Sequence, residues 1–212
     1  MTPAQRREQE KAALRERIID SARRLFAEEG FEQVTMRRIA QDIGYSATTL
    51  YLHFPDKQAL FAELCELDFT AMSAGFADLH RIADPIERII ALGRGYVQFA
   101  LNRPHHYRLM FMVPLSNDQA TMKATKCTER KGDPTQDSYA LLITMVEAAI
   151  AAGRMRREFR DPHLAGQVLW AGLHGVVALH LDKRNDPWVP WLPLPAQAEG
   201  MIAALLSGMA DP

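Results

Sequence analysis

The chain has 212 residues, of which 48% are hydrophobic and 24% are charged. This length suits one large domain or two small ones, and the apolar fraction suits a globular fold with a buried core. Lys and Arg number 25 against 26 Asp and Glu, a formal net charge of -1, which excludes nucleic-acid binding through overall charge and leaves only a local patch for any such contact.

The cysteines and the N-terminus favour a cytoplasmic protein. Cys65 and Cys127 lie too far apart in the sequence for metal-ligand spacing, which predicts two reduced thiols. The N-terminus is polar and charged through Arg17, so we expect no secretory signal. The most apolar run, 168–181, is shorter than the roughly 18 residues of a membrane span, so no membrane partner is expected.

The first predicted elements are an arm and a long helix. Residues 1–13 are polar and mostly charged, and we expect a flexible basic arm that merges into the helix. From Leu14 to Phe26, apolar residues recur at helical spacing with charged residues between them. Gly30 follows two glutamates and is expected to end this helix as a C-cap glycine.

The next segment predicts two short helices joined by a tight turn. Thr35 has the side chain of an N-cap, and apolar residues at helical spacing lead from it to Gly44, which permits a sharp turn with positive φ. Ser46 is expected to cap a second helix over 47–53, with Leu50 facing inward. This is the pattern of a helix-turn-helix, whose second helix enters the major groove of DNA.

The rest of the chain is predicted to be helical, because apolar residues recur at helical spacing and no segment alternates as a strand does. Asp84-Pro85 and Pro162 have the sequence of helix starts. Two segments lack a periodic pattern and are expected to be loops, 114–134 and the proline-rich 185–195. The expected helices are 57–73, 85–101, 105–112, 138–152, 163–181 and 197–209.

Spaced residues between positions 17 and 64 share one family pattern. They are the runs 18–31, 35–40, 44–46, 49–54 and 56–57, together with Leu60. In these positions the chain resembles the DNA-binding domain of the TetR family of regulators, with Tyr45 and Leu52 as mild departures from that pattern. The resemblance implies an all-α fold with two domains. These are an N-terminal three-helix bundle with the helix-turn-helix over 14–60 and a C-terminal helical domain for ligand binding and dimerisation over 61–212.

A second motif lies in the C-terminal part of the chain. Trp170, His174 and Gly175 form a Trp-x-x-x-His-Gly signature, and the run 107–111 lies upstream of it. In this signature the chain resembles a subset of the TetR family with a WHG-type regulatory domain. The resemblance implies a subfamily and names no ligand.

The predicted recognition helix begins with small polar residues, which suit contact with base edges. Thr48 and Thr49 provide hydroxyls, and the methyl group of Ala47 suits a thymine methyl. Phosphate contacts use hydroxyls, cations and helix N-termini. For Tyr51 and His53 the alternative is ordinary packing, and for Thr48 it is a solvent-facing position without a role. The expected DNA-binding residues are Thr35, Arg37, Tyr45, Ser46, Ala47, Thr48, Thr49, Tyr51, His53 and Lys57.

The expected partners are double-stranded operator DNA and a second copy of the chain. Two reading helices about 34–36 Å apart would contact successive major grooves of a palindromic operator, so the resemblance predicts a homodimer. Helices 138–152 and 163–181 are apolar on more than one side and would form an intersubunit four-helix bundle. Alternatively, the final helix contributes to the dimer interface, or the additional apolar surface of these helices is buried within one copy of the chain. Arg6, Arg7 and Lys11 would reach phosphates or a minor groove, with a solvated tail as the alternative.

The C-terminal half contains aromatic and methionine side chains that suit either a small-molecule pocket or a core. Arg108 and His174 are polar in an apolar setting, and each needs a ligand or a backbone carbonyl as its partner. His105 and His106 are adjacent and point about 100° apart on a helix, so we expect no metal site, and no cofactor is expected. The expected ligand-binding residues are Phe99, Tyr107, Arg108, Phe111, Met145, Trp170 and His174.

These observations favour a repressor that an unknown small-molecule effector releases from its operator. Effector binding would shift the dimer toward a state whose recognition helices are wrongly spaced. A constitutive DNA-binding dimer without a ligand is the first alternative, distinguished by whether the C-terminal domain has an accessible cavity. A helical enzyme is the second, but the sequence has no nucleophile motif, phosphate loop, cofactor fingerprint or zinc-helix motif.

Overall fold

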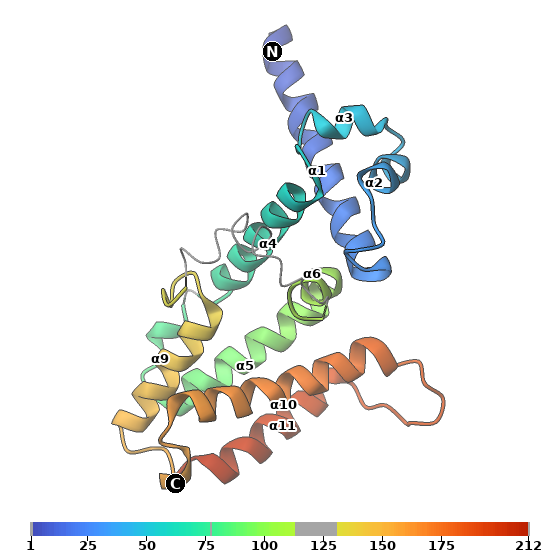
Figure 1. Cartoon of the computed structure of the whole chain (residues 1–212). Coiled ribbons are helices and arrows are strands. Elements are labelled where there is room, and N and C mark those ends of the chain that lie inside the picture. Colours follow the sequence, from blue (N-terminus) through green and yellow to red (C-terminus); the bar gives the residue numbers. More distant parts are fainter. Residues whose placement is uncertain (1, 77, 113–130, 212) are drawn as a thin grey trace. The chain divides into compact units, whose positions relative to one another are not determined.

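The computed structural model describes residues 2–76, 78–112 and 131–211 (Figure 1). Regular structure in these ranges is helical, apart from one isolated β-bridge between Met155 and Ala210, so the all-α prediction is confirmed. The described residues pack into two compact units, an N-terminal unit (2–68 and 105–112) and a C-terminal unit (69–76, 78–104 and 131–211). Most of the predicted loop over 114–134 lies outside the described residues, as does Cys127.

The first helix, α1 (Pro3–Glu29), includes most of the residues that were predicted as a flexible arm. Thr2 begins it with a capping box, in which the Thr2 hydroxyl accepts from the backbone N–H of Gln5 and the Gln5 side chain accepts from the Thr2 N–H at 2.8 Å. Pro3 occupies the first turn, where its missing N–H is not needed. Residues 3–13 are therefore helical, because polar residues without an apolar stripe still form a helix behind a good cap, while the flexibility of the arm over 1–13 stays a prediction.

Helices α2 (Met36–Ile43) and α3 (Ala47–Tyr51) form the predicted helix-turn-helix. The hydroxyls of Thr35 and Ser46 each accept a hydrogen bond from a backbone N–H three residues ahead, at 3.1 and 3.2 Å. Gly44 adopts the left-handed conformation, with φ 76°, in the turn between the helices. Both caps and the glycine turn are therefore confirmed.

Helix α3 ends at Tyr51, earlier than the predicted end at His53. The N–H groups of Leu52 and His53 bond to carbonyls three residues back, at 3.3 and 2.9 Å. Such bonds tighten the chain at a helix end, and Pro55 is incompatible with a continued helix. The segment after Tyr51 is thus a tight turn.

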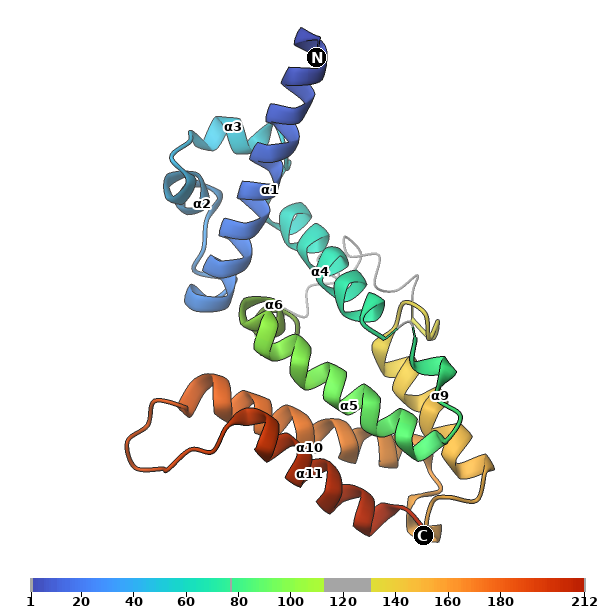
Figure 2. The ribbon, with the colours of Figure 1, turned by 180° about the vertical axis from the view of Figure 1, so that it is seen from behind.

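An aromatic cluster lies in the core of the N-terminal unit. The ring of Phe26 in α1 lies 5.3 Å from that of Phe31 and 5.9 Å from that of Phe61 in α4 (Lys57–Ala74), between ring centroids. Figures 1 and 2 both show α2 and α3 beside α1. Burial on this side leaves the opposite face of α3 exposed. The other large buried side chains of this core are Ile18, Leu25, Ile39, Leu50, Phe54, Leu60 and Leu64.

A buried carboxylate holds three helices of the N-terminal unit together. Asp68 of α4 is fully buried and accepts a hydrogen bond from Nε of Arg23 in α1 at 3.0 Å. Nδ1 of His106, in α6 (Pro104–Phe111), lies 2.7 Å from the same carboxylate. The N-terminal unit therefore extends past residue 60 to Asp68 and includes α6, which the sequence had placed in the second domain. Contacts between such distant residues leave no periodic signal.

The C-terminal unit is built from four long helices, which Figures 1 and 2 show packed along one another. The last of them begins at Leu194 rather than at Gln197, because Pro195 fits a first turn where no N–H is needed. The other three lie within a few residues of their predicted positions. The helices are α5 (Pro85–Asn102), α9 (Ser138–Ala151), α10 (Pro162–Lys183) and α11 (Leu194–Met209), with short 3-10 turns at Leu79–Arg81 and Arg157–Phe159.

Glycines let these helices approach one another closely. A Cβ at Gly93 of α5 would lie 2.9 Å from Cδ1 of Leu173 in α10. A Cβ at Gly172 of α10 would lie 2.7 Å from Cδ1 of Leu205 in α11. Helix α10 therefore lies close to both α5 and α11 at glycine positions, where an added Cβ would force a leucine side chain to shift.

Candidate DNA interface and effector site

The two predicted base-reading threonines of α3 differ in exposure. Thr48 is exposed, whereas Thr49 is half-buried and its Oγ1 lies 2.9 Å from Oγ of Ser46. Ala47 is half-buried beside them. Thr49 therefore reinforces the helix cap, and Thr48 provides the outward-facing hydroxyl.

The segments on either side of α3 expose large side chains. Tyr45 is 41% exposed, Tyr51 is 52% exposed and Leu52 is 77% exposed. Tyrosine hydroxyls are frequent phosphate ligands, and an exposed apolar side chain suits a thymine methyl. Leu52 was not among the predicted site residues, although its high exposure places it on the same surface segment.

Arg17 of α1 is a further residue that the prediction missed. Its guanidinium donates to the Ile43 carbonyl at 2.9 Å and lies 5.3 Å from the ring centroid of Tyr45. An exposed positive charge therefore lies beside the turn of the helix-turn-helix. The sequence carries no signal for this contact, because Arg17 and Tyr45 are 28 residues apart.

The predicted phosphate ligands differ in the hydrogen bonds and ion pairs that they make within the chain. Arg37 is exposed, and no carboxylate among the described residues pairs with it, whereas Arg38 bonds to Glu29 at 2.7 Å. Nζ of Lys57 donates to the Phe31 carbonyl at 2.8 Å and lies 4.3 Å from the Phe31 ring centroid. Lys57 therefore stabilises the segment after α1 through this hydrogen bond, while the guanidinium of Arg37 is exposed to solvent.

His53 is half-buried in the turn after α3. Burial lowers the pKa of His53, and the nearby charges of Arg15 and Lys11 lower it further. The backbone carbonyl of His53 accepts a hydrogen bond from Nη1 of Arg15 at 3.1 Å. The lowered pKa favours the uncharged imidazole, which can contact a phosphate as a hydrogen-bond donor.

In the C-terminal unit, three side chains form a hydrogen-bonded group. Nε1 of Trp170 donates to the hydroxyl of Tyr96 at 3.1 Å, and that hydroxyl lies 3.3 Å from Nδ1 of His174. Tyr96 is buried, and burial lowers the pKa of His174. The partner of His174 is thus a tyrosine hydroxyl, which the sequence did not identify.

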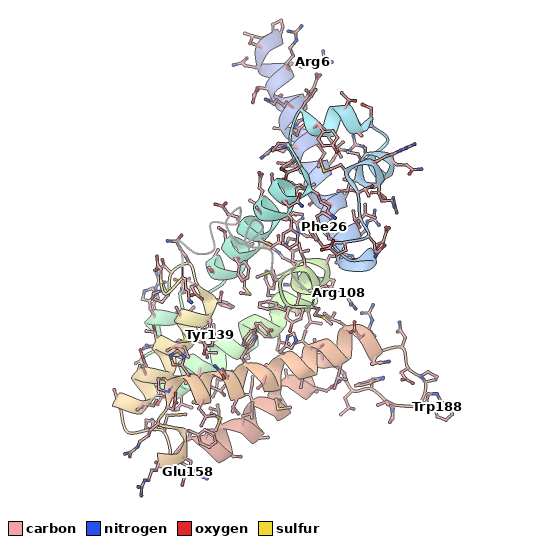
Figure 3. The ribbon with its side chains drawn as sticks, in the orientation of Figure 1. Arg6, Phe26, Arg108, Tyr139, Glu158 and Trp188 are labelled. Carbon is pink, nitrogen blue, oxygen red and sulfur yellow. The ribbon has the colours of Figure 1, made fainter. Side chains whose placement is uncertain are left out.

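The hydrogen-bonded group continues along one face of α10. The hydroxyl of Tyr139 in α9 lies 3.0 Å from Nδ1 of His163 and accepts from Nε2 of Gln167 at 3.3 Å. The rings of Tyr139 and Trp170 lie 6.2 Å apart between centroids. Figure 3 shows Tyr139 near α10, the helix that carries these partners. Positions three or four residues apart on α10 therefore present polar and aromatic groups on one side.

The predicted ligand-binding residues are divided between the two units. Tyr107, Arg108 and Phe111 belong to α6 of the N-terminal unit, where Tyr107 is fully buried and packs 5.0 Å from the ring of Phe111. The other four belong to the C-terminal unit, in which Met145 is a buried core residue and Phe99 is half-buried. The structure thus brings together two predicted pairs, Trp170 with His174 in the C-terminal unit and Tyr107 with Phe111 in the N-terminal unit.

Family comparisons agree with both units. Residues 18–64 match the family described as bacterial regulatory proteins, tetR family. Residues 89–205, more than half of the chain, match the tetracyclin repressor-like C-terminal domain. This chain belongs to the TetR family. It is therefore a transcriptional regulator with an N-terminal DNA-binding helix-turn-helix, and not an enzyme.

Curated relatives of this TetR-family chain match about a third of it. An HTH-type transcriptional repressor of Mycobacterium tuberculosis, Rv1474c, is 48% identical over 63 residues, which cover 30% of this chain and 34% of that protein. The HTH-type transcriptional repressor AcnR of Corynebacterium diphtheriae is 39% identical over 64 residues, again 30% of this chain and 34% of that protein. The match therefore spans about a third of the length of these relatives.

Solved structures resemble the TetR-family chain over nearly its full length. The fatty acid degradation regulator FadR of Bacillus halodurans aligns with a TM-score of 0.73 at 20% identity, covering 92% of this chain and 95% of that one. The ketosteroid transcriptional regulator KstR2 of Mycobacterium tuberculosis aligns with a TM-score of 0.70 at 20% identity, covering 93% and 95%. At these identities the comparisons establish the shared fold.

Proposed function

We propose that this TetR-family regulator is a cytoplasmic homodimeric repressor that binds a palindromic operator and is released by a small-molecule effector. The observation that carries the proposal is the exposed start of α3, which Ser46 caps and which presents Thr48 outward. Two curated relatives are named repressors, which supports the proposal that this chain represses rather than activates transcription. An exposed, capped helix of this kind suits the major groove.

The DNA contacts divide between base reading and phosphate binding. Thr48 contacts base edges, while Thr49 and Ser46 hold the helix start in place. Tyr45, Tyr51 and Arg37 are exposed around it and supply phosphate contacts. Because the chain has a net charge of -1, these local groups carry the electrostatic attraction. The remaining proposed contacts are Thr35, Ala47, His53 and Lys57, together with Arg17 and Leu52.

Dimerisation is proposed through the outer faces of α10 and α11. By length and composition alone, α10 is apolar enough to cross a membrane, yet only 33% of its most apolar window is buried within the unit. Leu164, Ala171 and Leu179 are among its exposed residues, and α11 exposes small residues that include Gly200 and Ala204. Two such helices from each copy make a four-helix bundle. The final helix would then take the place that the sequence had given to 138–152.

The effector is proposed to bind in the C-terminal unit, beside the hydrogen-bonded group of Tyr96, Trp170 and His174. Phe99 lies half-buried on α5, the helix that also carries Tyr96. A few polar groups among aromatic side chains are typical of a small-molecule site. Trp170 and His174 with Gly175 would also place the chain in the WHG-type subset. The ligand role of Met145 and of the α6 residues Tyr107, Arg108 and Phe111 stays a prediction.

The test begins with an operator selected from random duplexes by the purified protein. Thr48→Glu is expected to weaken binding to that operator at least about tenfold, because it adds negative charge and removes a base contact. Thr144→Glu on the exposed side of α9 adds the same charge away from α3 and is the matched control. Fluorescence anisotropy at fixed salt measures both. Unchanged specific binding of Thr48→Glu would contradict the proposed reading helix.

Release by an effector has its own measurement. Candidate small molecules are titrated into the complex of protein and operator, and an effector is expected to lower operator affinity. A panel with no response would support the constitutive DNA-binding dimer, the alternative that the sequence left open. The operator-binding test can therefore contradict the proposed recognition helix without bearing on the effector, and the titration can contradict effector release without bearing on the recognition helix.

A further inference from the structure

The connection between α10 and α11 exposes apolar side chains to an unusual degree. Trp188 is 90% exposed, Leu192 is 64% exposed and Val189 is 43% exposed. Leu179, near the end of α10, is 51% exposed. We call these four residues the loop-end patch. Figure 3 shows Trp188 at the far end of the loop, away from the helices of its own unit. Exposed apolar residues that gather in one place mark interaction sites.

The loop that carries the patch has a defined backbone. The N–H of Trp188 donates to a carboxylate oxygen of Asp186 at 3.0 Å, and the N–H of Trp191 donates to the Val189 carbonyl at 2.8 Å. The side chain of Gln197 donates to the Leu192 carbonyl at 2.7 Å. Three prolines between 187 and 193 further restrict the chain. A patch held in this way loses little conformational freedom when it docks.

Two buried polar atoms near the patch have no hydrogen-bond partner among the described residues. They are Nε1 of Trp191 in the loop and Nδ1 of His180 in the last turns of α10. A polar atom that is shielded from water and unpaired is unfavourable. Both atoms lie at the loop end of the α10–α11 pair but are enclosed by the chain itself, so the observation that supports docking is the exposure of the apolar side chains.

We propose that the loop-end patch docks on a second copy of this chain and extends the dimer interface beyond the helices. The inference rests on the proposed α10–α11 dimer face, because both helices run directly into the loop. Residues 187–198 carry no charged side chain, and the connection begins with the oppositely charged Arg184 and Asp186, so the patch offers an apolar surface rather than a charged one. A two-fold interface buries each patch once per copy, so the contribution of Trp188 is doubled.

Oligomeric state provides the first measurement. Sedimentation equilibrium of the full chain is expected to show a dimer whose dissociation constant rises at least about tenfold in Trp188→Ala. Trp188 packs on little of its own chain, so this variant keeps its fold. Leu67→Ala removes another exposed apolar side chain, in the N-terminal unit, and is expected to leave the dissociation constant unchanged.

Fluorescence provides the second measurement. In Trp170→Phe/Trp191→Phe, Trp188 is the remaining tryptophan. Its emission is expected to shift to shorter wavelength, and its quenching by acrylamide to fall, as concentration rises through the monomer–dimer transition. A dimer in which Trp188 stays fully quenchable and Trp188→Ala has the wild-type dissociation constant would overturn the docking proposal while leaving the helix-face dimer intact.

Two further outcomes would each overturn docking on a second copy. A chain that is monomeric at all concentrations would remove the proposed dimer, and the docking of the loop-end patch with it. Protection of Trp188 only on addition of phosphatidylcholine–phosphatidylglycerol vesicles would assign the patch to a lipid surface instead.

Discussion

The two units expose their large side chains in different chemical settings. In the N-terminal unit the exposed rings are tyrosines, Tyr45 and Tyr51, and the guanidinium of the exposed Arg17 lies 5.3 Å from the ring centroid of Tyr45. In the C-terminal unit the exposed side chains are Trp188, Leu192 and Leu179, on helices and a loop with few charges. The first surface suits a partner with phosphates, and the second suits another apolar surface. The difference is the one expected if the N-terminal unit binds DNA and the C-terminal unit packs against a second copy, as proposed above.

The largest expected effect concerns the buried ion pair of the N-terminal unit, which stabilises that unit without any partner. Asp68→Ala leaves the buried Arg23 with only the exposed Asp20 as a carboxylate partner and also removes the carboxylate beside His106, so it should lower the free energy of unfolding by about 3–5 kcal/mol. Urea unfolding followed by circular dichroism measures the change. Asp78→Ala removes a carboxylate from an exposed pair with Arg81 and should leave stability nearly unchanged. A small loss in Asp68→Ala would show that this unit does not depend on its buried ion pair.

The next effect tests whether the exposed face of α11 in the C-terminal unit forms the proposed dimer interface. Ala204→Asp places a charge on the exposed face of α11 and should weaken the dimer by about 2–4 kcal/mol, since each copy would bury an unpaired carboxylate. Mass photometry at a series of concentrations measures the dimer fraction. Ala12→Asp makes the same change on the exposed side of α1 and should leave the dimer fraction as it is. Dimers of unchanged strength in Ala204→Asp would place the interface elsewhere.

A smaller effect separates the cap of α3 from its contact with DNA. Ser46→Ala removes the acceptor of the Thr49 N–H and should lower stability by about 1 kcal/mol. Ser46→Asp retains a capping oxygen, so its stability should stay close to wild type, whereas its operator affinity should fall through repulsion by phosphate. Thermal unfolding and anisotropy measure the two properties. If Ser46→Asp bound the operator as well as wild type, the start of α3 would lie away from the phosphates.

The smallest effect concerns pH and the C-terminal unit. Burial lowers the pKa of His174, so the unfolded chain binds a proton at a higher pH than the folded one. The stability that this histidine contributes is complete above its unfolded pKa of about 6.5 and is lost as pH falls from there through the folded pKa. Urea unfolding at pH 7.5 and pH 5.5 should therefore show a smaller difference in His174→Gln than in wild type. An equal difference would assign the acid sensitivity to other groups, such as His53 and His180, whose pKa values burial also lowers.

The sequence by itself determined the local structure of the helix-turn-helix. Thr35, Gly44 and Ser46 were each predicted in the roles that the structure gives them. Their hydrogen bonds and dihedral angles involve residues no more than a few positions away, so the local pattern is sufficient to specify them. The same reasoning overlooked the capping box of Thr2 and Gln5, a local signal without an apolar stripe behind it. The resemblance to the TetR family that residues between 17 and 64 carry is confirmed by the family match over 18–64.

Only the tertiary structure decided which distant residues meet. Tyr96 and His174 are 78 residues apart, and Arg23 and Asp68 are 45 apart. Helical periodicity reports which side of a helix is apolar, but it does not say which other helix covers that side or whether any does. The exposure of Trp188 and the placement of α6 in the N-terminal unit follow from that long-range packing, which no local pattern records.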